Sequence, residues 1–331
     1  MTATTLRQMW HVAPHAGAHH PALRMAIAAL VPPVLLTMAG QPTWAGWALL
    51  GAVTAAYARS DSPRRRLRVQ AMVGLVLVLL VIIATVLAAA AVPGIVLVLA
   101  TAVVAGLATV LADAGRWSPP GALFPVFVFG AASAIPAGFS TVGLLWALSV
   151  TASSDFFRTR SARPSPNPPQ PSRAVTRTTA LHAAICFAGA AVAGSIALTA
   201  GLRHPSWAMV AAVVPVVGVS TGAQILRAGH RLVGTLLGVL VAGVLFLHAP
   251  GPLEIAVLTA VLLFGAELLI ARNYSLALLF ITPLTIGMSH PDTPDRLLAL
   301  MADRALETVI GVVVAVALIA AAHRIRPKLL R

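Results

Sequence analysis

The chain has 331 residues, of which 59% are hydrophobic and only 10% are charged, and its mean hydropathy is +0.91. Soluble domains carry about 25% charged residues, so this composition excludes an ordinary soluble enzyme and a disordered chain. Lysine and arginine outnumber aspartate and glutamate by 23 to 9, with the arginines at the ends of apolar runs. This pattern is typical of a polytopic helical membrane protein and not of a nucleic-acid-binding protein.

A membrane-spanning helix needs about 20 apolar residues, and the apolar runs predict about twelve such helices joined by short loops. We therefore expect an all-α fold. The predicted segments, in chain order, are 22–40, 44–58, 69–91, 94–112, 120–134, 138–153, 179–201, 207–222, 232–248, 252–271, 274–289 and 303–322.

The polar segment 1–20 lacks the pattern of a cleaved signal peptide. If this segment is cytoplasmic and the twelve helices alternate, nearly all lysines and arginines fall on the cytoplasmic side. Cytoplasmic loops of membrane proteins carry such an excess. We therefore expect both termini, including the tail at 324–331, in the cytoplasm. The only lysines or arginines that this topology places on the non-cytoplasmic side are Arg203, Arg296 and Arg304.

Residues 158–177 are rich in proline and arginine and cannot form a span or a packed core. They predict a cytoplasmic linker between two membrane halves, 21–157 and 178–323. Gln41-Pro42-Thr43-Trp44 resembles His204-Pro205-Ser206-Trp207 across this linker. The similarity predicts two tandem six-helix repeats.

A second symmetry lies within the second half. Residues 231–238 and 304–311 both fit the pattern R-x-x-[GE]-T-x-x-G. The two copies are three predicted helices apart, so they have opposite orientations in the membrane. Inverted repeats of this kind build transporters around a site near the membrane midplane. The pattern is consistent with an inverted 3+3 repeat in each half.

Each copy of the motif places an arginine and a threonine on one helical face, with small residues beside them. The arginines, Arg231 and Arg304, suit binding of a carboxylate, and Thr235 and Thr308 lie one turn further on. The same face equally predicts a close-packed helix seam. Both interpretations are open at the level of the sequence.

Two glutamates in the predicted spans are candidates for proton coupling, because ionisable groups within a membrane usually face the protein interior or a water-filled path. Glu307 shares a face with Arg304 and can pair with it as an i, i+3 neighbour. Glu267 lies five residues before Arg272, near the end of its span, where its side chain can instead reach the membrane surface.

Residues 230–238, 274–283 and 304–311 resemble the fusaric acid resistance protein-like family, which includes the aromatic acid exporters. The resemblance implies a permease of the bacterial inner membrane that exports aromatic or other organic acids. The first half lacks the arginine motif. On this resemblance, the candidate substrate-binding residues are Arg231, Thr235, Arg304, Thr308, Tyr274 and Thr282.

The sequence contains no phosphate-binding loop, nucleophile elbow, zinc cluster or dinucleotide fingerprint, so we expect no enzymatic activity, no cofactor and no metal. The predicted function is secondary transport of organic anions out of the cell, driven by the membrane potential or a proton gradient. An anion channel and a non-transporting membrane scaffold are the alternatives. The expected partners are a small organic anion and the lipid bilayer, and a homo-oligomer is compatible with the sequence.

Overall fold

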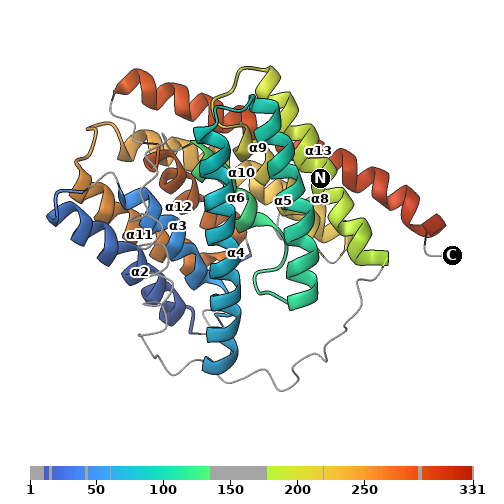
Figure 1. Cartoon of the computed structure of the whole chain (residues 1–331), viewed down its shortest axis with the longest axis horizontal. Coiled ribbons are helices and arrows are strands. Elements are labelled where there is room, and N and C mark those ends of the chain that lie inside the picture. The colour runs from blue at the N-terminus through green and yellow to red at the C-terminus, as the bar shows by residue number, and fades with distance from the viewer. Residues whose placement is uncertain are drawn as a thin grey trace. The chain divides into compact units, whose positions relative to one another are not determined.

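The structure, a computed structural model, describes residues 11–14, 17–41, 44–59, 61–134, 177–218, 220–289 and 293–329. Within these ranges the regular elements are helices, with no strand among them (Figure 1), which confirms the predicted all-α class. The sixth predicted segment, 138–153, and the predicted linker up to residue 176 lie outside the described residues.

Every other predicted segment coincides with a helix, and two of the shorter helices end in a 3-10 turn, labelled η. The elements are α2 His19–Met38, α3 Ala45–Ala52, η2 Val53–Ala56, α4 Pro63–Ala89, α5 Gly94–Gly115, α6 Leu123–Ala134, α8 Arg177–Thr199, α9 Pro205–Val213, η3 Val214–Val217, α10 Thr221–Leu245, α11 Pro252–Ile270, α12 Tyr274–Gly287 and α13 Pro294–Leu329.

Seven of the described helices are long and apolar enough to cross a membrane: α2, α4, α5, α8, α10, α11 and α13. Four other apolar helices are shorter: α3 with η2, α6, α9 with η3, and α12. The longest of these, α12, has 14 residues. At 1.5 Å per residue it extends about 21 Å, less than the roughly 30 Å of the hydrocarbon core. Twelve complete spans are therefore not confirmed.

The helices that carry the two arginine motifs begin earlier than their apolar segments. Helix α10 begins at Thr221, where the prediction placed the start at 232, and α13 begins at Pro294, where the prediction was 303. The first turns of both helices are too polar to register as an apolar run, but they are helical. Arg231 and Arg304 consequently lie ten residues inside their helices.

The chain forms two compact units. Helices α2, α3, α11 and α12 contact one another within unit 1, and α5, α6, α8 and α9 contact one another within unit 2. The boundaries between the units fall inside α4, α10 and α13. Of the described residues, those up to Leu79 and those from Gly234 to Ala302 belong to unit 1, and those from Leu80 to Ala134, from Arg177 to Val233 and from Asp303 onward belong to unit 2.

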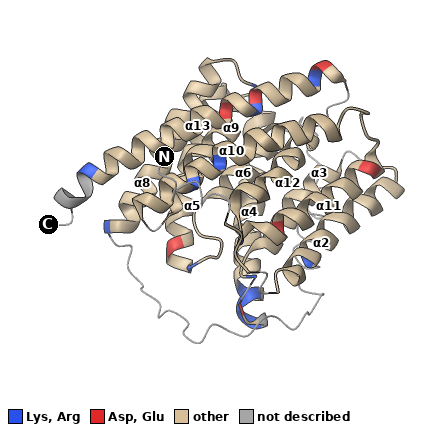
Figure 2. Cartoon of the chain, turned by 180° about the vertical axis from the view of Figure 1, so that it is seen from behind, with Lys and Arg blue, Asp and Glu red and all other residues tan. Residues whose placement is uncertain are grey.

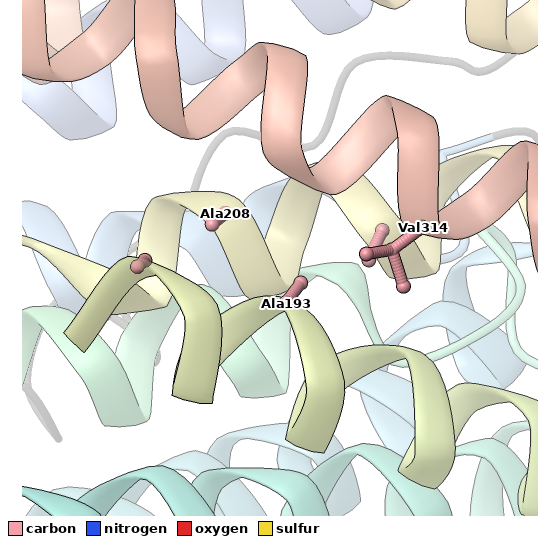
Figure 3. Close-up of a cluster of buried hydrophobic side chains, with 5 residues drawn as sticks. Ala193, Ala208 and Val314 are labelled. Atoms are coloured by element: carbon pink, nitrogen blue, oxygen red, sulfur yellow. The ribbon is translucent and has the colours of Figure 1, made fainter. Parts of the chain in front are cut away.

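Small side chains fill the place where α8, α9 and α13 meet in unit 2 (Figure 3). The buried cluster consists of Ala193, Ala197, Ala208, Ala212 and Val314. Alanine keeps the helix axes close, because little side-chain volume separates the backbones. This close approach brings the polar residues of α13 against the start of α9.

Candidate functional site

Charged and aromatic side chains meet where the start of α9 faces α13 in unit 2. We name His204, Trp207, Arg304 and Glu307 the α9–α13 cluster. The Arg304 guanidinium lies over the Trp207 ring, 4.6 Å from its centre, and the His204 ring stacks on Trp207 with 4.5 Å between centroids. The His204 backbone N–H donates to Glu307 Oε1 at 3.1 Å. A cation over an aromatic face and an amide on a carboxylate are both favourable contacts for buried charges.

Three of the four side chains in the cluster are almost completely shielded from solvent, and His204 is partly buried. Arg304 is 2% exposed, Trp207 6% and Glu307 0%. Glu307 Oε2 has no hydrogen-bond partner among the described residues. Both ionisable groups therefore lie inside the helical bundle of unit 2, as expected for functional charges in a membrane protein.

The rest of the α13 motif serves packing. The Thr308 hydroxyl donates to the Arg304 backbone carbonyl at 2.8 Å, and Thr308 is fully buried. A Cβ atom added at Gly311 would collide with the backbone carbonyl oxygen of Ala208. The packing interpretation of the motif therefore applies to α13, which forms a close seam with α9. The buried charges are compatible with carboxylate binding, which stays a prediction.

The α10 copy of the motif forms an equivalent seam with α12 in unit 1. A Cβ atom at Gly234 would lie 2.5 Å from the Ser275 carbonyl oxygen, and one at Gly238 would lie 2.6 Å from the Leu278 carbonyl oxygen. Thr235 and Thr282 are fully buried, and their hydroxyls have no hydrogen-bond partner among the described residues.

The predicted substrate-binding residues are divided between the two units. Arg304 and Thr308 lie together in unit 2, while Thr235 and Thr282 lie at the α10–α12 seam of unit 1. Tyr274, the first residue of α12, is buried in unit 1, and Arg231 is buried in the part of α10 that belongs to unit 2. Their roles in binding stay predictions.

Glu267 is buried and paired and does not extend into solvent. It is 8% exposed, and its Oε1 accepts from Arg59 Nη1 at 2.7 Å within unit 1. Arg24, which is 3% exposed, also interacts electrostatically with this carboxylate and donates to the Ala55 carbonyl at 3.5 Å. We name Arg24, Arg59 and Glu267 the α11 carboxylate cluster.

Sequence reasoning missed four residues of these clusters as site residues. Trp207 and His204 were noticed only as part of a repeated tetrapeptide, although an aromatic residue beside a buried arginine is a recognisable signal. Arg59 and Arg24 were counted only as topology-setting charges. Arg59 is 208 positions from Glu267 in the chain, and no local spacing could connect them.

Comparison with known proteins supports the resemblance. Residues 189–318 match the family described as Fusaric acid resistance protein-like. This range contains α9 to α12 and both copies of the arginine motif. Together with the apolar helices, the match indicates a multi-pass membrane protein that is similar to this family.

One relative is the "Uncharacterized membrane protein YvaC" of Bacillus subtilis (strain 168). It is 36% identical over 90 residues, which are 27% of this chain. The aligned part spans only 14% of that relative's own length. No solved structure matches the chain.

Proposed function

We propose that the protein is a secondary transporter that exports small organic carboxylates, aromatic ones included, across the bacterial inner membrane. The observation that supports this proposal most strongly is the α9–α13 cluster, in which a buried arginine lies over a tryptophan ring inside a membrane helix bundle. Ionisable side chains buried in a membrane helix bundle are costly and usually mark a functional site. A structural seam alone does not require them, whereas anion binding does.

Each residue of the cluster has a role in this proposal. Arg304 binds the carboxylate, because its planar guanidinium offers two parallel donors and stays charged when poorly hydrated. Trp207 offers the flat apolar face against which an aromatic or aliphatic substrate body packs. Glu307 competes for Arg304 and limits how tightly the anion is held. Protonation of Glu307 would remove its negative charge and favour substrate binding.

Thr235, Thr282 and Tyr274 are the proposed counterpart at the α10–α12 seam of unit 1, and Arg231 is a proposed substrate-binding residue of α10 in unit 2. The buried hydroxyls of Thr235 and Thr282, which have no partner in the part of the chain that the structure describes, support this assignment, because buried hydroxyls normally make a hydrogen bond. We assign proton coupling to Glu307 rather than to Glu267, because an ion pair with Arg59 already engages Glu267.

The membrane potential supplies enough driving force for this proposal. An inside-negative potential favours efflux of a monovalent anion by about 2.3 kcal/mol per 100 mV, which is about a 50-fold accumulation outside. A channel would use the same force. The burial of Arg304 and Glu307 favours a carrier, in which the site is closed between exposure to the two sides.

Reconstitution into liposomes tests the proposal, with benzoate as the probe. We expect saturable benzoate flux from the parent protein. The flux should fall more than tenfold in the double variant Arg304→Gln/Glu307→Gln and severalfold in Trp207→Leu, which loses the aromatic face. The matched control is Arg203→Gln, which removes an exposed arginine paired loosely, at 3.9 Å, with Asp303.

The outcomes separate the alternatives. Equal flux in the double variant and the control would show that the cluster is structural. Large single-channel currents would identify a channel. No flux from any well-folded protein, with any of several carboxylates, would favour the scaffold.

A further inference from the structure

Two carboxylates of α13 lie about one helical turn apart, and both are largely removed from solvent. Figure 2 shows that the acidic residues of α13 lie in its first half, and two of them are Asp303 and Glu307. The Asp303 side chain is 17% exposed and Glu307 is 0% exposed. Residues four positions apart share one face of a helix, with about 5–6 Å between their Cβ atoms. Their carboxyl groups can therefore reach each other, and Asp303 is among the charges that act on Glu307.

Each of these two side chains has an oxygen that is buried and makes no hydrogen bond. In the part of the chain that the structure describes, the only carboxylate oxygens of this kind are Asp303 Oδ2 and Glu307 Oε2. A buried acceptor without a donor is costly, and native structures contain few of them. Because both occur on neighbouring side chains of one helix face, they indicate a donor that the two carboxyl groups share.

The other charged and titratable groups at this place do not supply that donor. Arg304 interacts electrostatically with Glu307, but Oε2 accepts no hydrogen bond from a described residue. Arg203 Nε is 3.9 Å from Asp303 Oδ2, which is beyond hydrogen-bond distance. The His204 backbone N–H donates to the other oxygen of Glu307, Oε1. The donor must therefore come from outside these groups.

A proton between the two carboxyl groups meets this requirement. Two ionised carboxylates at one site repel each other, and a single proton removes that repulsion. The resulting O–H···O⁻ hydrogen bond gives Oδ2 and Oε2 a partner each, and hydrogen bonds of this charge-assisted type are short and strong. The pair then keeps one negative charge, which is opposite to the charge of the buried Arg304.

We propose that Asp303 and Glu307 form a proton-binding site in which the two carboxyl groups share one proton. Asp303, whose side chain is partly exposed, exchanges the proton with solvent and passes it to the fully buried Glu307. In this transfer the Asp303 carboxyl group becomes a carboxylate and the Glu307 carboxylate becomes a carboxyl group. The link to transport rests on the proposed function, whereas proton binding does not require that the protein transports anything.

Infrared spectroscopy of the full-length protein in lipid nanodiscs tests the shared proton. A protonated carboxyl group has a C=O stretching band that an ionised carboxylate lacks. At neutral pH we expect this band in the parent protein. We expect its loss in Glu307→Gln and equally in Asp303→Asn, because each variant removes one of the two groups that hold the proton.

Two further variants locate the effect. The matched control Asp295→Asn removes an exposed carboxylate from the first turn of the same helix and should keep the band. The double variant Arg304→Gln/Glu307→Gln removes the opposite charge together with Glu307, and it replaces Glu307→Gln if the single variant does not fold. The double variant should also lack the band.

Two results would overturn the site. A parent protein without the band would hold both carboxylates ionised, and a band that persists in Asp303→Asn would belong to a carboxyl group that does not share its proton. Benzoate flux in liposomes reports separately on transport, and its pH dependence should be lost in Asp303→Asn and kept in Asp295→Asn. If the infrared bands behave as expected but no protein transports a carboxylate, the proposed function fails and the proton site stands.

Discussion

Replacing Gly311 by alanine should loosen the seam between α13 and α9. The new Cβ atom would collide with the Ala208 carbonyl oxygen and would lie 2.5 Å from the Ala211 Cβ and 2.9 Å from the Ala212 nitrogen. Two of these three atoms are backbone, so no side chain can rotate away. The helices must therefore separate, and the small-residue cluster in Figure 3 loses contacts.

The magnitude follows from two opposing effects. Alanine in place of glycine within a helix stabilises it by roughly 0.5–1 kcal/mol. Overpacking a tight contact costs about 1–3 kcal/mol, so we expect a net loss of about 1–2 kcal/mol for Gly311→Ala. The matched control is Gly222→Ala in α10, because a Cβ atom there would meet no atom of the described residues within 4 Å.

The assay is thermal unfolding of both variants in nanodiscs, followed by the intrinsic fluorescence of the tryptophans. The midpoint should fall for Gly311→Ala and stay equal or rise for Gly222→Ala. Equal midpoints for the two variants would show that α13 does not approach α9 as closely as the structure has it. The same comparison can be made at Gly238, which faces α12 in unit 1.

Two other predictions can be checked without a transport assay. Arg304→Gln alone should reduce the amount of folded protein in membranes more than Arg304→Gln/Glu307→Gln, because Arg304 interacts electrostatically with Glu307 and a buried charge left without its opposite costs about 3–5 kcal/mol; equal yields would show that the charges do not compensate each other. A cysteine at Ser165, with Cys186 replaced, should react with a membrane-impermeant thiol reagent only in opened cells, and labelling of intact cells would contradict the predicted cytoplasmic linker.

The positions of the described helices followed from the sequence, but not all of their lengths did. A helix that is buried in the bilayer or in the protein core needs apolar residues, so an apolar run shows where such a helix lies. Apolar runs do not show that a polar first turn is helical, and so the starts of α10 at Thr221 and α13 at Pro294 were missed. Apolar runs also do not distinguish short helices from complete spans, because a buried apolar helix of 14 residues has the same composition as a membrane-spanning helix.

The candidate site could be predicted only in part. The motif spacing correctly placed Arg304, Glu307, Thr308 and Gly311 on one face of a helix. It could not identify the partner of that face, because helix pairing depends on tertiary contacts between residues distant in sequence. The contact of Arg304 with Trp207 spans 97 positions, the difference between their residue numbers.

Each motif helix packs on the short helix that precedes the other motif helix, and this exchange of short helices leads to a last prediction. Helix α10 follows α9 in the chain, but Gly234 and Gly238 of α10 pack on α12. Helix α13 follows α12, but its Gly311 packs on α9. Neither α8–α10 nor α11–α13 can bury its own motif face alone, so a chain divided at Gly251 should yield fragments that are stable only together. We expect each fragment to be degraded when expressed alone and both to accumulate and co-purify when expressed together. A protease-resistant fragment 252–331 without its partner would show that α11–α13 folds independently and that the exchange is not required for the fold.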